Sequence, residues 1–80
     1  MPRRQKPDPD ALRVGQRIQE LYKAQRLTLE AAAERCGMNK GHLSNITRGL
    51  AVVTVATLFR IARGLGVPAG ELVTFPQEGE

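Results

Sequence analysis

The sequence has few aromatic residues and almost no cysteine. It contains no Trp, one Tyr and two Phe among its 80 residues, and Cys36 is the only cysteine. The scarcity of aromatic rings argues against binding of single-stranded nucleic acids, whose bases stack on such rings. A single cysteine excludes an intrachain disulfide and a cysteine-based zinc cluster, and it favours a reducing, cytoplasmic location.

The sequence also lacks a long hydrophobic run. The longest apolar stretch, residues 50–65, is interrupted by two Thr, two Arg and one Gly, which makes it too polar to cross a bilayer. The first ten residues are basic but lack the apolar segment of a signal peptide. We therefore expect no membrane association.

Positive charge is in excess, and it lies in the middle of the chain. Twelve Lys and Arg against eight Asp and Glu give a net charge of +4, and residues 13–71 hold nine of these basic and four of these acidic residues. A chain this short has room for one hydrophobic core. We expect a flexible, Pro-rich basic arm over residues 1–12, a folded domain over residues 13–74 and a short acidic tail over residues 75–80. The basic domain favours an anionic partner.

Hydrophobic spacing and capping residues predict an all-α domain of five short helices. The expected helices cover about residues 10–25, 28–36, 39–48, 54–65 and 68–73. Asp10, Thr28 and Asn39 are the expected N-caps, because their side chains can accept a hydrogen bond from a free backbone N–H group. Gly37 is expected to end the second helix, and Gly64 is expected to weaken the end of the fourth.

The second and third helices are separated by a very short turn. Only residues 37–39 lie between them, so the third helix must cross the second steeply, as in a helix-turn-helix. Ala33 is small where the two helices approach each other, and Met38, Leu43 and Ile46 are expected to fix the third helix on the core. This arrangement leaves a set of residues without a packing role: Asn39, Lys40, Gly41, His42, Ser44, Asn45 and Arg48.

The segment Thr28–Gly49 resembles the helix-turn-helix of the Cro/C1 (XRE) family of phage repressor-like regulators, and the likeness extends from about Val14 to Val73. The matching residues of the motif are Thr28, Leu29, Glu30, Ala33, Gly37, Met38, Asn39 and the run Leu43-Ser44-Asn45-Ile46-Thr47-Arg48-Gly49. The resemblance implies a compact five-helix bundle that binds double-stranded DNA as a homodimer, with the third helix in the major groove.

Three positions depart from the family pattern. The family commonly has Gln where this chain has Leu29, and that Gln contacts a DNA phosphate. It commonly has Glu where Thr47 stands and a larger aliphatic residue where Ala32 stands. The first departure removes a phosphate contact, and the other two indicate a different local packing.

The expected base contacts are made by the third helix. Lys40 can donate to O6 and N7 of guanine, and Asn45 can pair with N6 and N7 of adenine, each pair discriminating by about 1–3 kcal/mol. Gly41 leaves space for the DNA backbone or a thymine methyl group. Asn39 and Ser44 complete the set of expected base contacts. The alternative is that Lys40 and Asn45 are merely solvated surface residues.

The expected phosphate contacts flank these positions. They are Thr28 at the start of the second helix, His42 and the cation Arg48 beyond the third helix. Phosphate contacts set the register of the protein on DNA but carry no sequence information. His42 is the only histidine, and no other residues of metal-binding type surround it, which argues against a metal site. The alternative to a DNA contact is that His42 is simply an exposed polar residue.

The sequence contains no constellation for catalysis, metal binding or cofactor binding. Ser44 has no base and acid arranged with it, and we expect no enzyme activity, cofactor, metal or small-molecule substrate. Cys36 is expected to be a small buried hydrophobic residue, with a redox switch as the alternative.

We expect a homodimer, because one recognition helix contacts too few base pairs to select a site in a genome. Two copies would contact half-sites about 34 Å apart. The candidate interface residues are Val67, Val73 and Phe75, which a small domain is unable to bury entirely.

The sequence therefore predicts a DNA-binding transcriptional regulator, either a repressor or an autoregulatory controller, that binds a palindromic operator as a homodimer. Phage-type repressors, restriction–modification controllers and antitoxins all remain open as its biological role, and a protein partner is possible. The alternative function is a protein-interaction or antitoxin-type module of the same fold with weak or no DNA binding, which the loss of Gln at Leu29 favours.

Overall fold

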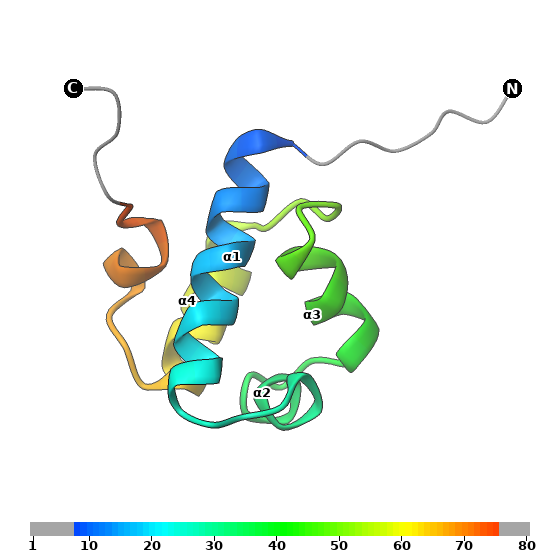
Figure 1. The fold of residues 1–80 in the computed structure, drawn as a ribbon, viewed down its shortest axis with the longest axis vertical. Coiled ribbons are helices and arrows are strands. Elements are labelled where there is room, and N and C mark those ends of the chain that lie inside the picture. The colour runs from blue at the N-terminus through cyan, green and yellow to red at the C-terminus, as the bar shows by residue number, and fades with distance from the viewer. Residues whose placement is uncertain (1–7, 76–80) are drawn as a thin grey trace, which may run out of the picture.

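The computed structural model describes residues 8–75, which form four α-helices and one 3-10 helix (Figure 1). The elements are α1 (Pro9–Ala24), α2 (Leu29–Arg35), α3 (Lys40–Thr47), α4 (Val55–Leu65) and the 3-10 helix η1 (Ala69–Val73). Helix α1 runs along the centre of the molecule, α2 crosses near its C-terminal end, and α3 and η1 lie on opposite sides of it (Figure 1). The all-α class predicted from the sequence is confirmed.

Each α-helix begins at a side chain that accepts a hydrogen bond from the backbone. Asp8, Thr28, Asn39 and Thr54 each accept from the N–H group three residues ahead, over 2.7–3.1 Å. These bonds satisfy donors that the first turn of a helix leaves free, which is why the helices start at these residues. The predicted caps Thr28 and Asn39 are confirmed.

The cap expected for α1 is wrong by two residues. Asp8 rather than Asp10 caps this helix, because Pro9 is well suited to the first helical position, where its missing N–H group costs nothing. Asp10 lies in the first turn. Residues 9–12, which we assigned to the flexible arm, therefore belong to α1, whereas residues 1–7 of that arm and residues 76–80 of the tail lie outside the described residues.

The fifth element is a 3-10 helix, so the predicted bundle of five full helices is corrected to four helices and a short turn. Pro68, at the start of the element, cannot donate a backbone hydrogen bond, and Gly70 follows two residues later. A segment of five residues that contains this glycine and follows this proline is too short to form a stable α-helix. Leu72 of this element is nevertheless completely buried, so η1 closes the core.

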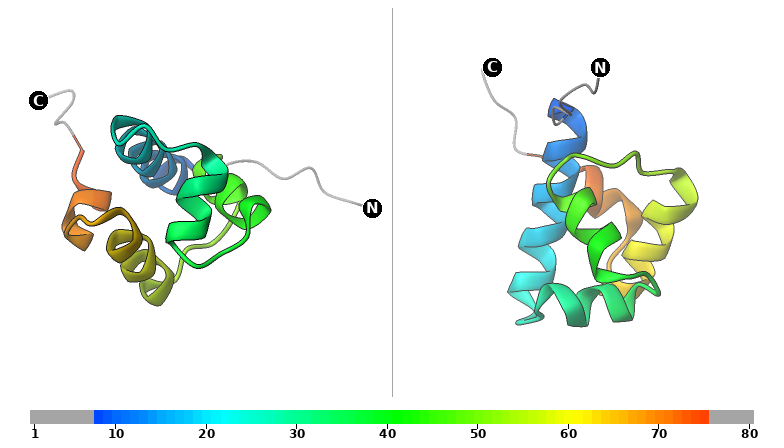
Figure 2. Two further views of the ribbon diagram at one scale, coloured as in Figure 1. Left: turned by 90° about the horizontal axis from the view of Figure 1, so that it is seen from below. Right: turned by 90° about the vertical axis from the view of Figure 1, so that its right-hand side faces the viewer.

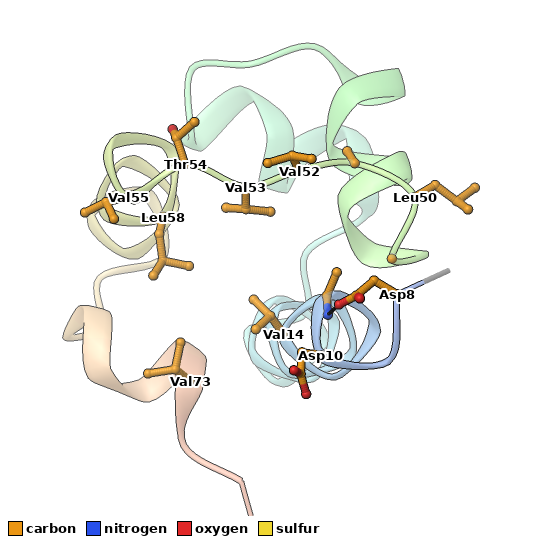
Figure 3. A pocket seen from close by; sticks show the side chains of 13 residues that line it. Asp8, Asp10, Val14, Leu50, Val52, Val53, Thr54, Val55, Leu58 and Val73 are labelled. Atoms are coloured by element: carbon orange, nitrogen blue, oxygen red, sulfur yellow. Dashed lines mark hydrogen bonds between the residues drawn. The ribbon is translucent and has the colours of Figure 1, made fainter. Parts of the chain in front are cut away.

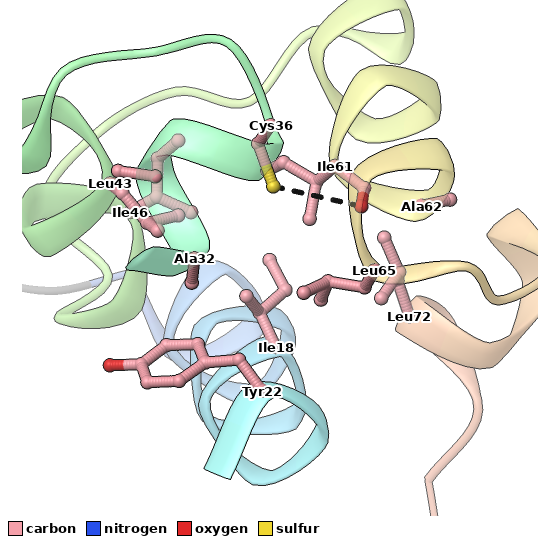
Figure 4. Packing of buried hydrophobic residues seen from close by; sticks show 11 residues of the cluster. Ile18, Tyr22, Ala32, Cys36, Leu43, Ile46, Ile61, Ala62, Leu65 and Leu72 are labelled. Atoms are coloured by element: carbon pink, nitrogen blue, oxygen red, sulfur yellow. Dashed lines mark hydrogen bonds between the residues drawn. The ribbon is translucent and has the colours of Figure 1, made fainter. Parts of the chain in front are cut away.

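The hydrophobic core lies between α1 and the other four elements (Figure 4). Every element contributes at least one buried side chain to a single cluster. Its members are Ile18, Tyr22, Ala32, Ala33, Cys36, Leu43, Ile46, Ile61, Ala62, Leu65 and Leu72. Burial of this apolar surface is the main force that holds the short helices together.

Two glycines allow helices to approach unusually closely. A β-carbon at Gly15 would lie 2.7 Å from Cα of Thr47, so α1 packs directly on the backbone of α3. A β-carbon at Gly64 would lie 2.7 Å from the carbonyl oxygen of Arg35, which brings α4 against α2. The helix α4 ends at Leu65 as predicted, and the close contact with α2 explains why a glycine stands at position 64.

Within the described residues, no helix is long and apolar enough to cross a membrane.

Candidate nucleic-acid interface

A tight turn places α3 across α2. The N–H group of Met38 donates to the carbonyl of Ala33 over 3.0 Å, and that of Gly37 donates to the carbonyl of Glu34 over 3.1 Å. Gly37 has a φ of 69°, in the left-handed region that glycine adopts with little strain. Ala33 is buried where the helices meet. This is the helix-turn-helix geometry that the spacing predicted.

Helix α3 has a buried face and an exposed face. Leu43, Ile46 and Thr47 are buried against the rest of the molecule. The opposite face exposes Lys40, Gly41, His42 and Asn45, together with the flanking residues Asn39 and Arg48, whereas Ser44 is half-buried. In the right-hand view of Figure 2, α3 lies at the front of the molecule with α2 crossing below it. The residues expected to contact DNA therefore lie on one accessible element.

Asn39 is partly engaged in the fold. Its Oδ1 atom accepts a hydrogen bond from the N–H group of His42 over 2.7 Å. The side-chain amide nitrogen remains as the donor that Asn39 can offer to DNA. Asn39 therefore both begins α3 and presents a donor at the end of the helix nearest the turn.

Lys40 forms an ion pair that the sequence analysis missed. Its Nζ atom lies 3.6 Å from Oε2 of Glu30 on α2, and both side chains are exposed. In the sequence, Glu30 is distinguished only as a residue that matches the family motif. The pairing depends on the crossing of α2 and α3, which no local signal in the sequence specifies.

The three predicted phosphate contacts, Thr28, His42 and Arg48, are all exposed. Oγ1 of Thr28 accepts from the N–H group of Ala31 over 3.0 Å, so its hydroxyl hydrogen is still available to donate. Arg48 follows the last residue of α3, and its backbone N–H group donates to the carbonyl of Ser44. Thr28 and Arg48 therefore flank the helix-turn-helix, and His42 lies on the exposed face of α3.

The departures from the family pattern have visible packing roles. Leu29 is half-buried and packs against the core, so its side chain contributes to the fold. Thr47 is buried, and its hydroxyl donates to the carbonyl of Ser44 over 2.8 Å.

A second accessible surface is apolar. The exposed large hydrophobic residues are Val52 (89% exposed), Val55 (70%), Phe59 (49%) and Val73 (49%). Val52, Val55 and Val73 line a groove of about 560 Å³ between α1, the loop before α4, α4 and η1 (Figure 3). We call these four residues the apolar surface.

The residues expected at a dimer interface differ in their surroundings. Val73 belongs to the apolar surface, whereas Val67 is half-buried and packs against the core. Phe75 is also half-buried, and the guanidinium of Arg13 lies 5.0 Å from its ring centre, close enough for a cation–π interaction. Val52, Val55 and Phe59 are exposed as well, but they were not among the residues predicted for the interface.

Cys36 is buried between α2 and α4. Its Sγ atom lies 3.8 Å from the carbonyl oxygen of Ile61, and burial raises the pKa of the thiol. A raised pKa keeps the group neutral and unreactive near pH 7. The geometry therefore supports a structural role for Cys36. Among the described residues, no group of three His, Cys, Asp or Glu could hold a metal ion.

A tight turn, a buried anchor and an exposed polar face on α3 together define a helix-turn-helix DNA-binding protein. The chain belongs to the helix-turn-helix family HTH_3, the Cro/C1-type (XRE) transcriptional regulators, whose family model matches residues 18–72. The resemblance noted in the sequence is thereby confirmed. Proteins of this family are regulators and not enzymes, as the sequence analysis expected.

Two relatives match most of this chain. It is 39% identical over 61 residues to the uncharacterised HTH-type transcriptional regulator y4dJ of Sinorhizobium fredii, a match that covers 76% of this chain and 79% of y4dJ. It is 37% identical over 60 residues to the HTH-type transcriptional regulator SutR of Escherichia coli. That match covers 75% of this chain but only 34% of SutR.

Solved structures show the same fold. The restriction-modification controller protein C.AhdI from Aeromonas hydrophila superposes with a TM-score of 0.77 at 28% identity, over 80% of this chain and 93% of that protein. An HTH_3 family transcriptional regulator from Vibrio cholerae gives a TM-score of 0.76 at 31% identity, over 80% of this chain and 36% of that protein.

Proposed function

We propose that this regulator binds a palindromic DNA operator as a homodimer, with α3 of each copy in the major groove. The observation that carries the proposal is the division of α3 into a face buried through Leu43 and Ile46 and an exposed polar face. A helix held in this way can enter the groove without losing its packing on the domain. Occupancy of the operator would make the protein a repressor or an autoregulatory controller.

Lys40 and Asn45 are the main base-contacting residues in this proposal, and Asn39, Gly41 and Ser44 support them. Lys40 donates to guanine and Asn45 pairs with adenine. The cation of Lys40 already lies near Glu30, so the ammonium group is held at the start of α3. Thr28, His42 and Arg48 contact phosphates and fix the register of the domain on the duplex.

The proposed dimer interface is the apolar surface. It keeps Val73 from the sequence prediction and adds Val52, Val55 and Phe59, whereas Val67 and Phe75 contribute mainly to the domain itself. The loop that carries Val52 directly follows α3 along the chain (Figure 1). A two-fold axis beside this loop would bring two α3 helices to one side of the dimer, as two half-sites about 34 Å apart require.

Selection from a random duplex library, followed by binding to the selected sequence, tests the proposal. We expect a palindrome, with Lys40→Ala and Asn45→Ala relaxing the preference at one base position each by about 1–3 kcal/mol. Arg48→Ala should weaken binding to all duplexes alike and reduce the salt dependence. If Lys40→Ala and Asn45→Ala retain the full sequence preference, α3 is not the recognition helix.

A protein-interaction module with weak DNA binding is the second candidate, and the inward packing of Leu29 favours it. The two functions differ in salt dependence. A DNA-binding regulator loses affinity for duplex DNA steeply as salt rises and prefers one sequence over random duplex. An interaction module shows neither behaviour.

A further inference from the structure

All four α-helices end in the same hydrogen-bonded motif. In each, a residue in the left-handed conformation donates its N–H group to the carbonyl three residues earlier, and the next residue donates to the carbonyl five residues earlier. This is the Schellman motif, in which the left-handed position is usually glycine. The residues at this position are Arg26, Gly37, Gly49 and Gly66, with φ of 62°, 69°, 73° and 71°.

Arg26 is the exception among the four. The two bonds of its motif, from Arg26 to Lys23 and from Leu27 to Tyr22, are both 2.9 Å long, so the geometry is as regular as in the three glycine motifs. In the left-handed conformation the Cβ atom of an arginine is crowded by its own backbone, whereas glycine has no Cβ atom. Glycine would therefore form this helix end with less strain.

The fold does not use the side chain that causes this strain. Arg26 is exposed, and within residues 8–75 its guanidinium forms no ion pair and no hydrogen bond. The end of α1 already carries Lys23 in its last turn, which interacts favourably with the helix dipole. A strained conformation with no benefit to the fold points to a role outside it.

The position of Arg26 indicates what that role is. It lies two residues before Thr28, in the turn between α1 and α2, and this turn is at the lower edge of the face that presents α3 (Figure 2, right). The side chain of Leu29, three residues further on, packs inward and offers no hydrogen-bond donor to DNA. A guanidinium at this edge carries a full positive charge and donors that match a phosphate group.

We propose that Arg26 contacts the DNA phosphate backbone and supplies the anchoring contact that Leu29 does not make. This inference rests on the proposed function, because it requires α3 to bind in the groove. The contact lies on the α2 side of α3, whereas Arg48 lies at the C-terminal end of α3, so the two arginines would hold the domain from both sides.

The test is to replace Arg26 by glycine and measure stability and DNA binding in the same protein. Relief of strain should raise the melting temperature of Arg26→Gly by a few degrees, about 4 °C for a domain of this size. Loss of one phosphate contact per copy should weaken binding to the selected operator and to random duplex by a similar factor, about fivefold to tenfold for each copy. Because the dimer loses two such contacts, the slope of log K against log salt should fall by about 1.8.

Two further variants separate a contact from a general charge effect. Arg26→Lys keeps the charge and should keep most of the salt slope. Arg63→Ala removes one positive charge from an exposed position on α4, outside the helix-turn-helix, and should change the slope much less than Arg26→Gly does. Because Arg26→Gly is expected to be more stable, weaker binding by this variant cannot come from unfolding.

The outcomes distinguish this inference from the proposed function. If the unaltered protein binds duplex DNA with sequence preference but Arg26→Gly behaves like Arg63→Ala, only the role of Arg26 is wrong. If the unaltered protein binds no duplex DNA, the proposed function fails and the role of Arg26 fails with it.

Discussion

The surface around α3 and the apolar surface beside α4 are built in opposite ways. On α3 the apolar residues Leu43 and Ile46 are completely buried, and every exposed side chain is polar or charged. At the start of α4, by contrast, Val52 and Val55 are among the most exposed large hydrophobic residues of the described chain. A polar face suits the hydrated groove of DNA, and an apolar face suits a protein surface. The domain therefore has two surfaces of different character, one suited to each kind of partner.

Introducing a charge into the apolar surface should have the largest effect on DNA binding. We expect Val55→Asp to give a monomer, because a buried, unpaired carboxylate opposes association. A monomer loses one half-site and its base contacts, so operator affinity should fall by at least about 100-fold. Sedimentation velocity and operator binding measure the two effects.

The control is Thr57→Asp, which places the same charge on α4 outside the apolar surface. It should leave the dimer intact. If Val55→Asp is still a dimer in sedimentation, the interface lies elsewhere on the domain.

Gly15→Ala should disturb the α3 surface and leave the apolar surface in place. The added Cβ atom would meet the backbone of Ile46 and Thr47, and it cannot be accommodated without moving α3 relative to α1. Overpacking of this kind costs about 1–3 kcal/mol, so the free energy of unfolding should fall by about 2 kcal/mol. Urea denaturation measures the loss.

Gly70→Ala is the matched control for this substitution, because a Cβ atom at Gly70 meets no atom within 4 Å. It should change stability by less than about 1 kcal/mol. Equal stability of the two variants would mean that the close contact between α1 and α3 does not hold α3 in place.

Alkaline pH should lower the free energy of unfolding through Cys36, which is buried between α2 and α4. Burial raises the pKa of the Cys36 thiol, so the thiol stays neutral in the fold after the unfolded chain has begun to ionise. The neutral thiol contributes fully to the free energy of unfolding at pH values below the ordinary pKa of cysteine. This contribution is lost as the pH rises through the higher pKa that the thiol has in the folded protein. The loss is at most about 1.4 kcal/mol per pH unit.

Denaturation of the reduced protein between about pH 8 and pH 10, compared with Cys36→Ala, isolates this effect. The alanine variant is less stable throughout because it leaves space in the core, but its stability should fall less steeply with pH. Parallel curves for the two proteins would exclude a contribution from the thiol.

Local signals predicted much of the fold, and tertiary contacts explain what was missed. Thr28 and Asn39 cap helices through bonds to residues only three positions away, so sequence alone identifies them. Gly15, in contrast, matters because of the backbone of α3, more than thirty residues later. Nothing near it in the sequence marks it as different from any glycine inside a helix.

The candidate site also has one part that the sequence predicts and another that it does not. The exposed residues of α3 follow from helical periodicity once Leu43 and Ile46 are placed in the core. The partner of Lys40 depends on how α2 crosses α3, and periodicity contains no information on this. The left-handed conformation of Arg26 arises locally, but at a helix end where glycine is usual and the sequence has none. The contacts of Val67 with the core and of Phe75 with Arg13 were not foreseen, because they join distant parts of the chain.

The ion pair between Lys40 and Glu30 changes what Lys40 gains from DNA. In the proposed complex, the ammonium group does not exchange water for guanine; it exchanges a carboxylate of its own protein for guanine. Where a duplex has no guanine at that position, Lys40 keeps its internal partner, and the charge of Glu30 stays compensated. Where guanine is present, Lys40 leaves Glu30 without its partner, so a residue that never contacts a base would lower what the right sequence gains.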